Sequence, residues 1–276
     1  ALHPRYEQAQ RNRVLAEVEP RLLDLCQKAK AAGMGLNVDA EEADRLDLSL
    51  DVIEAVLDDQ SLAGWDGFGV VVQAYGKRAG PVIDWLYALA ARLDRRIMVR
   101  LVKGAYWDTE IKRAQVAGLP GFPVFSEKAA TDVSYLACAK NLLQKPDRLY
   151  PQFATHNAHF VEAVLELAQA LDVSHDAYEF QRLHGMGEAL YDQLRQSNTV
   201  RCRIYAPVGA HRDLLAYLVR RLLENGANSS FVHQVMDEDV TPKAVAADPF
   251  DAVGKGVPVT APADLFAPER VNSAGF

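Results

Sequence analysis

The sequence predicts an α/β protein, a TIM-type (βα) barrel with two strands missing upstream and an irregular tail at the end. Six short apolar segments alternate with segments of helical periodicity between residues 35 and 225. Such alternation is typical of right-handed βα units, which form a parallel sheet with helices outside. Polar side chains also follow the C-terminal ends of the apolar segments, where a closed barrel has its functional rim.

The predicted strands are short apolar runs bounded by turn residues, at 35–40, 67–75, 95–108, 151–157, 178–185 and 203–208. Helices are expected up to Lys30, at 41–60 and 81–93, from about 109 and about 127, up to 171, up to 196, and at 212–225. Gly33 and Gly226 are typical helix stops, and Pro81 is a typical helix start. The segment 118–126, rich in glycine and proline, predicts a loop that covers a site.

The chain divides by composition into a barrel at 1–239 and a tail at 240–276. The tail is rich in Pro, Ala and Gly and poor in large apolar residues, which is typical of a linker, with one helical turn near Phe250. A chain of 276 residues that is 49% apolar can bury one sizeable core.

Charge and cysteine content exclude several classes of function. The net charge of −7 argues against nucleic acid as a partner, because a phosphate backbone requires a basic surface. There is no bilayer-length apolar run and no signal-peptide pattern, so we expect a soluble, intracellular protein. Cys26, Cys138 and Cys202 are far apart, which predicts neither disulfides nor a zinc site and favours small, buried cysteines.

The helix at 212–225 carries a polar stripe and an apolar face. Helical spacing places Tyr217, Arg220, Arg221 and Glu224 on the stripe, and Leu215, Leu218, Val219 and Leu222 opposite. A solvated arginine face is the ordinary interpretation of such a stripe. Alternatively, the preceding strand directs Tyr205 towards the same place, and two guanidinium groups beside a tyrosine form a clamp for carboxylate or phosphate.

Three other patterns favour structural or non-metal roles when each is considered alone. His156 and His159 are three residues apart without a third ligand at a supporting spacing, so we expect no metal. The segment LHGMGE at 183–188 lacks the dinucleotide-binding pattern GxGxxG, and its glycines suit a tight turn. Tyr106 and Trp107 after a glycine are more often packing residues than ligand contacts.

Taken together and in order, five segments resemble the proline dehydrogenase domain of proline utilization A flavoproteins. The segments are RLVKGAYWD, YPQFATHNAH, YEFQRLHGMGE, CRIYAPVG and LLAYLVRRLLENGANSSF. The resemblance covers about 1–231 almost continuously, and the tail resembles the family's connector towards an aldehyde dehydrogenase domain. No single segment is specific, but the combination is.

The resemblance implies a distorted (βα)8 barrel that binds FAD at its rim and oxidises L-proline to Δ1-pyrroline-5-carboxylate. It implies transfer of electrons to a membrane quinone and a covalently linked aldehyde dehydrogenase domain. The expected location is the cytoplasm, with any contact with the inner membrane being peripheral, because no membrane-spanning segment is evident.

The resemblance also assigns roles to residues of this chain. Arg100, Asp39 and Tyr205 are the implied catalytic residues; Arg100 would lie near the reactive edge of the flavin, and Asp39 would orient the charged groups of the pocket. The implied substrate contacts are Arg220 and Arg221 for the proline carboxylate and, around the ring, Tyr217, Leu183, Ala105 and Tyr106. The implied FAD contacts are Gln73, Arg100, Val102, Lys103, Gly104, Trp107, Ser126, Lys128, Thr155, His156, Asn157, Gln181, Glu224, Ser230 and Phe231.

One departure from the family pattern concerns the N-terminus. The family has a pocket lysine on a strand just before the ALHPRY motif, and this chain starts after that strand. We therefore expect residues 1–276 alone to form an incomplete barrel that retains little flavin. Yellow, proline-reducing protein made from these residues alone would contradict that expectation.

Two competing functions share part of this evidence. Another flavin-binding barrel that acts on a folate or an amine would use the same rim, but it leaves the paired arginines beside Tyr205 unexplained. A non-catalytic barrel that serves as a scaffold for an aldehyde dehydrogenase partner would leave the polar rim without a cofactor. Flavin absorbance that is bleached by L-proline separates all three.

Overall fold

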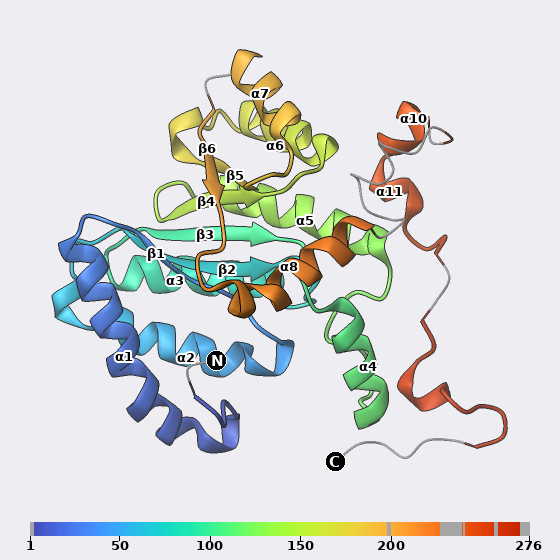
Figure 1. Cartoon of the computed structure of the whole chain (residues 1–276), viewed down its shortest axis with the longest axis horizontal. Helices are drawn as coiled ribbons and strands as arrows, with labels where there is room; N and C mark the ends of the chain where they lie inside the picture. Colours follow the sequence, from blue (N-terminus) through green and yellow to red (C-terminus); the bar gives the residue numbers. More distant parts are fainter. Residues whose placement is uncertain (1–2, 198–199, 227–238, 240, 257–258, 271–276) are drawn as a thin grey trace.

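A computed structural model describes residues 3–197, 200–226, 239, 241–256 and 259–270 of the chain. Within these residues six parallel strands form one sheet in the order of the sequence: β1 (Leu36–Val38), β2 (Phe68–Gln73), β3 (Ile97–Val102), β4 (Leu149–Ala154), β5 (Glu179–Leu183) and β6 (Cys202–Tyr205). The sheet curls into a half-barrel (Figure 1), so the expected partial (βα)8 barrel is confirmed.

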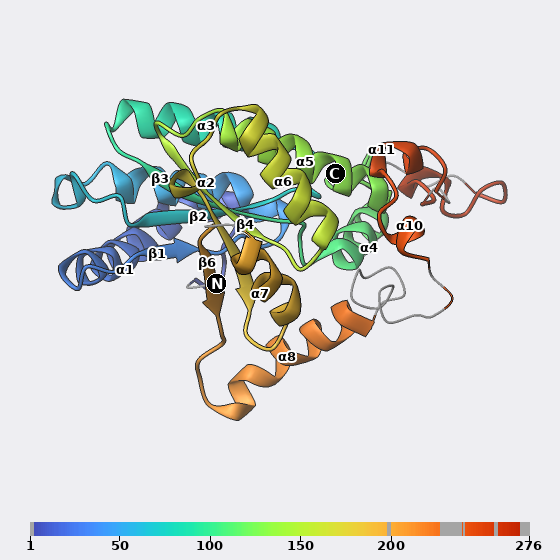
Figure 2. The same ribbon diagram turned by 90° about the horizontal axis from the view of Figure 1, so that it is seen from above.

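Helices precede, connect and follow the strands. They are α1 (Arg11–Ala31), α2 (Leu46–Leu57), α3 (Ala79–Arg92), α4 (Trp107–Ala117), α5 (Lys128–Leu143), α6 (Ala158–Ala170), α7 (Glu188–Ser197) and α8 (His211–Gly226). Short helices are α10 (Pro242–Val245), α11 (Pro249–Ala252) and the 3-10 helices η1 (Gln8–Gln10), η2 (Ala43–Arg45), η3 (Gln60–Leu62), η4 (His175–Ala177) and η5 (Pro262–Asp264). Figure 2 shows α3, α5 and α6 on one side of the sheet and α8 on the other.

The curl of the sheet is visible in one contact across its concave face. Asn37 of β1 donates a hydrogen bond to Gln152 of β4 at 2.9 Å, although β2 and β3 lie between these strands in the sheet. The register places Gly69 of β2 beside Asn37, and a Cβ atom at Gly69 would lie 2.4 Å from the Asn37 side chain. Glycine at this position therefore leaves the space that the Asn37 side chain needs.

The hydrophobic core lies between the convex face of the sheet and the helices. Side chains that alternate with the concave-face residues are fully buried there, among them Phe153 of β4 and Phe180 of β5. The ring centroids of these two residues are 6.0 Å apart, and Tyr178 contacts both rings edge-on. These three rings form an aromatic layer on β4 and β5. In the same core Tyr135 of α5 stacks on Phe160 of α6 at 5.1 Å.

Several element boundaries differ from the sequence-based expectation. The helix expected from residue 41 begins with η2 at Ala43 and continues as α2, because Glu41 and Glu42 remain in the connection from β1. The helix α4 starts at Trp107 rather than at 109, and β6 ends at Tyr205 rather than at 208. The tail does contain the helical turn expected near Phe250.

The apolar face of α8 is exposed rather than packed. Leu215, Leu218 and Val219 are exposed, whereas the side chain of Leu222 lies outside the described part of the structure. Amphipathic spacing predicted the two faces of this helix but could not show what each face contacts.

Described parts of the tail pack against the barrel helices. The amide of Gly254 donates to Glu127 at the start of α5 at 2.8 Å, and Gln115 of α4 donates to the Thr260 carbonyl at 3.2 Å. Val259 packs against the small apolar cluster of Tyr75, Ile111 and Val124. The tail is thus more closely associated with the barrel than its composition suggested.

The cysteines follow the expectation of small, buried residues in part. Cys26 and Cys138 are buried, Cys202 is half-buried, and all three are free thiols. Burial raises the pKa of Cys26 to about 11, so this thiol stays protonated at neutral pH. Among the described residues, no helix is long and apolar enough to cross a membrane, and no three His, Cys, Asp or Glu side chains are grouped as metal ligands.

Replacement of Phe153 by alanine should lower the free energy of unfolding by about 3 to 5 kcal/mol, since it removes a fully buried ring from the aromatic layer. The change in the free energy of unfolding is measured by urea denaturation, with unfolding monitored through amide hydrogen exchange in β4 and β5. The matched control is Phe250→Ala, which removes a ring that is 62% exposed and should change stability by about 0.5 kcal/mol or less. Equal losses for the two variants would contradict this account of the core.

Candidate functional site

The concave face of the half-barrel brings together several of the residues that the sequence singled out. The register pairs Gln73 with Val102, Arg100 with Gln152, and Leu183 with Tyr205. Because side chains alternate along each strand and paired residues share a face, these side chains all project to one side near the C-terminal ends of the strands. We call this surface the concave rim.

Arg100 lies at the centre of the concave rim. Its Nη1 atom lies 3.3 Å from Asp39 Oδ1, and its guanidinium group lies 4.5 Å from the centre of the Tyr205 ring. The Arg100 side chain is 19% exposed, whereas that of Asp39 is 77% exposed. The Nε atom of Arg100 is buried and has no hydrogen-bond partner among the described residues, so this guanidinium group retains a donor for a ligand. Arg100 therefore contacts both of the other implied catalytic residues.

The helix α8 adds residues to the same region. The guanidinium group of Arg221 lies 5.2 Å from the centre of the Tyr217 ring. The pKa of the Tyr217 hydroxyl is raised, first by burial and then by Tyr205, while Arg221 and Arg100 oppose the change. Tyr217 is thus near both Tyr205 and Arg100. The side chains of Arg220 and Glu224, and all of Ser230 and Phe231, lie outside the described residues.

His156 follows β4 and is held as a neutral imidazole. Its Nε2 atom accepts a hydrogen bond from the backbone amide of Leu183 at 3.0 Å, which leaves the proton on Nδ1. Burial, together with the positive charges of Arg182, Arg221 and Arg100, lowers its pKa to about 4. At neutral pH this ring offers an N–H donor at Nδ1 and carries no charge.

The residues beside His156 are held by local hydrogen bonds. Asn157 Oδ1 accepts from the amide of His159 and caps α6, while Thr155 Oγ1 accepts from the amide of Asn157 at 3.2 Å. Tyr191 of α7 donates to the Thr155 carbonyl at 2.7 Å. These contacts fix the connection between β4 and α6 in place.

Positive charge collects near the N-terminus of α5. Lys103 Nζ lies 2.5 Å from Asp132 and 4.3 Å from the centre of the Phe160 ring. Lys128 is the first residue of α5, and its pKa is lowered by desolvation and by the nearby charge of Lys103, while Asp132 opposes the change. Glu127 at the N-cap makes no side-chain capping bond, so the amides of the first turn remain available. Two ammonium groups and a helix N-terminus are donors for an anion, and the Asp132 carboxylate pairs with one of the two ammonium groups.

The connection from β3 to α4 carries the remaining implied contacts. Gly104 has φ of 131°, and a Cβ atom there would lie 2.5 Å from the Tyr75 ring, so only glycine fits. Ala105 follows it and is exposed. Tyr106 is the N-cap of α4, and Trp107 donates from Nε1 to the carbonyl of Phe125 at 2.7 Å, which ties α4 to the loop that contains Ser126.

A buried carboxylate below the rim was missed by the sequence argument. Glu179 is 3% exposed and accepts hydrogen bonds from Gln152 and Gln181 at 2.9 Å each, and from Arg203 at 2.8 and 2.9 Å. A charged residue beside an apolar one in the strand YEFQRL was the available signal. Its significance depended on which strands lie next to β5, which local sequence does not show.

Comparison with known proteins places this geometry in a family. A sequence model of the proline dehydrogenase family matches residues 2–234. The chain belongs to the proline dehydrogenase family. The bifunctional PutA proteins of Salmonella typhimurium and Escherichia coli K12 are each 54% identical to it over 293 residues. These matches cover 100% of this chain but 22% of each relative, so the chain spans less than a quarter of their length.

Solved structures of the family have the same fold. A crystal structure of mutant proline utilization A from Bradyrhizobium japonicum matches 100% of this chain and 28% of its own, with a TM-score of 0.94 and 60% identity. A structure of the protein from Bdellovibrio bacteriovorus, inactivated by N-propargylglycine, matches 94% of this chain and 27% of its own, with a TM-score of 0.87 and 31% identity. The partial barrel is therefore the proline dehydrogenase fold of these proteins.

The environment of His156 makes its charge state testable in this member of the proline dehydrogenase family. With its pKa lowered from 6.5 to about 4, its imidazole NMR signals should stay constant from about pH 8 to about pH 5. The unfolded chain binds a proton as the pH falls below 6.5, whereas folded His156 does not until about pH 4. This residue therefore contributes stability above pH 6.5 that is lost as the pH falls towards 4.

The signals of His156 are assigned by their absence from the spectrum of a His156→Asn variant. A titration midpoint near 6.5 for the assigned signals would contradict the acceptor role of Nε2.

Proposed function

We propose that this chain carries out FAD-dependent oxidation of L-proline to Δ1-pyrroline-5-carboxylate, the first step of proline catabolism. The observation that carries the proposal is the contact of Arg100 with Asp39 and Tyr205 on the concave rim, close to Tyr217 and Arg221 of α8. Membership of the proline dehydrogenase family supports the same activity.

The proposed proline site uses charge at one end and apolar walls around the ring. Arg220 and Arg221 bind the carboxylate, since paired guanidinium groups match the geometry of a carboxylate and stay charged at every physiological pH. Tyr205 and Tyr217 enclose the ring, and Leu183, Ala105 and Tyr106 complete the walls. Fixing the carboxylate fixes which ring carbon lies nearest the reacting partner.

The residues present fit a flavin dinucleotide. The unpartnered Nε donor of Arg100 suits the polar edge of an isoalloxazine ring, and the Nδ1–H group of neutral His156 is a second donor. Lys103, Lys128 and the uncapped N-terminus of α5 suit the diphosphate. The further proposed contacts are Gln73, Val102, Gly104, Trp107, Ser126, Thr155, Asn157, Gln181, Glu224, Ser230 and Phe231.

In this reaction the C–N bond of proline becomes a C=N bond, with loss of two electrons and two protons from the ring nitrogen and the adjacent carbon C5. When bound, FAD supplies the acceptor for those electrons. Arg100 holds a positive charge on the concave rim, Asp39 keeps that side chain oriented, and the tyrosines exclude water from the ring of the substrate.

The proposal extends to the natural protein. It includes a division into a barrel at 1–239 and a connecting tail at 240–276. It also includes a covalently linked aldehyde dehydrogenase domain and a membrane quinone as the final electron acceptor. The bifunctional PutA relatives, which are several times longer than this chain, support the linked domain. We place the protein in the cytoplasm, with peripheral contact at the inner membrane.

The decisive experiment uses the purified natural protein at full length. Its visible flavin absorbance should bleach under anaerobic conditions on addition of L-proline, because the bound cofactor accepts two electrons. Pyrrolidine, which lacks the carboxylate, should bleach it much more slowly. Flavin that L-proline leaves oxidised would exclude proline oxidation and favour another flavin-dependent substrate, whereas protein without flavin would favour a scaffold.

The Arg221→Met variant should raise KM for L-proline by roughly 10- to 100-fold, corresponding to loss of a charged hydrogen bond of about 1.5 to 3 kcal/mol. Its flavin content should be unchanged. The matched control is Arg212→Met on the same helix, since the Arg212 side chain is 90% exposed and should not affect KM. The carboxylate role of Arg221 is wrong if the two variants have equal KM values.

A further inference from the structure

The segment Asp39–Arg45 connects β1 to α2, and its first residue, Asp39, contacts Arg100. With 77% of its side chain exposed, Asp39 is not held by burial. Beneath the segment, between β2, α2 and α3, lies an apolar cavity of about 80 Å³ whose lining includes Asp39 to Ala43, Leu50 and Val82. A backbone above a cavity lacks part of its van der Waals support, so its position depends on polar anchors.

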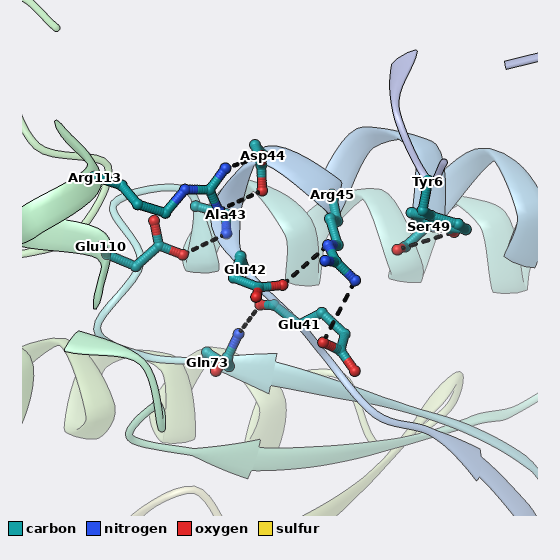
Figure 3. Close-up of polar contacts among 10 residues, drawn as sticks. All are labelled: Tyr6, Glu41, Glu42, Ala43, Asp44, Arg45, Ser49, Gln73, Glu110 and Arg113. Carbon is teal, nitrogen blue, oxygen red and sulfur yellow. Dashed lines mark hydrogen bonds and ion pairs between the residues drawn. The ribbon is translucent and has the colours of Figure 1, made fainter. Parts of the chain in front are cut away.

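Four anchors reach this segment from other elements, and Figure 3 draws three of them. Gln73 Nε2 donates to the carbonyl of Glu41 at 2.8 Å. Arg113 of α4 pairs with Asp44, and Glu110 of α4 accepts from the amide of Ala43 at 2.6 Å. Arg78, at the N-cap of α3, donates to the carbonyl of Ala43 at 2.7 Å. The four contacts therefore join the segment to β2, α3 and α4.

Glu110 differs from the other charged anchors in its surroundings. It is 4% exposed, whereas Arg113 and Asp44 have side-chain exposures of 48% and 57%, so water screens their ion pair. The Arg78 side chain is 46% exposed, so water also competes with its bond to the Ala43 carbonyl. The amide that Glu110 binds is the first of η2, which continues into α2, so a carboxylate there also complements the positive end of a helix. A buried, charged hydrogen bond outweighs an exposed ion pair in fixing a backbone position.

Glu110 also connects two parts of the candidate site. Its own amide donates to the carbonyl of Tyr106 at 2.9 Å, and Trp107 begins the same helix. One side chain thus links the N-terminal turn of α4, with its implied ligand contacts, to the segment that carries Asp39.

We propose that Glu110 is a positioning residue: it holds the Asp39–Arg45 segment against α4 and thereby sets the position of Asp39 relative to Arg100. Its effect on proline oxidation rests on the proposed function, whereas its effect on the segment does not. Glutamine at this position keeps an oxygen acceptor for the Ala43 amide, and alanine removes it.

The first test is independent of activity and measures amide hydrogen exchange in the natural, full-length protein. In Glu110→Ala, exchange at Ala43 and its neighbours should become roughly tenfold faster or more, because a buried hydrogen bond is lost. Glu110→Gln should retain most of the protection, and Asp44→Asn, which breaks only the exposed ion pair, should change it little. Circular dichroism and the unfolding temperature confirm that each variant is folded.

The second test measures whether Glu110 acts through Asp39. Glu110→Ala should lower kcat/KM for L-proline roughly tenfold with flavin content retained, and Glu110→Gln should restore most of it. In an Asp39→Ala background the same Glu110→Ala change should have almost no further effect, because the side chain that it positions is gone.

The outcomes separate the two proposals. Unchanged exchange at Ala43 in Glu110→Ala overturns the anchor, and fully additive effects of the two alanine substitutions overturn its action through Asp39. A wild-type protein that does not oxidise proline refutes the proposed function and the catalytic part of this inference together, while the exchange result still decides whether Glu110 holds the segment.

Discussion

The arrangement of the concave face depends on one buried carboxylate. Glu179 is 3% exposed, and three side chains from β4, β5 and β6 donate hydrogen bonds to its carboxylate, as a buried charge requires. The four hydrogen bonds are directional, and each donor stands on a strand at a defined register. Satisfying this single charge therefore fixes the positions of three strands relative to one another, which apolar contacts alone do not achieve with the same precision.

The same polar layer supports the rim above it. Gln152 accepts from Asn37 on its other side and is paired in register with Arg100. The curl that brings β1 towards β4 also brings Asp39, just beyond β1, to Arg100 on β3. The space left by Gly69 permits that curl. The proposed site thus consists of two polar layers, a lower one saturated by the protein and an upper one with a donor left for a ligand.

Much of the fold could be predicted from the sequence because its signals are local. Apolar runs, turn residues and helical spacing depend on near neighbours, and they identified all six strands and the residues at their ends. Contacts between distant segments could not be found in this way: Glu110 and Ala43 are 67 residues apart, and Asn37 and Gln152 are 115 apart. The exposure of Leu215 and Val219 could not be predicted either, because amphipathic spacing shows that a helix has two faces but not what lies against them.

The strand order has a consequence for how the chain acquires its structure. Each described strand pairs only with the strands immediately before and after it in the chain, all in parallel. During synthesis every new βα unit therefore meets an edge that is already in place, and the sheet can grow in the direction of translation. The polar layer is the exception, because the Glu179 carboxylate gains its Arg203 partner only when β6 has been made. Once β6 has been made, the buried Glu179 carboxylate therefore has all of its hydrogen-bond donors in place.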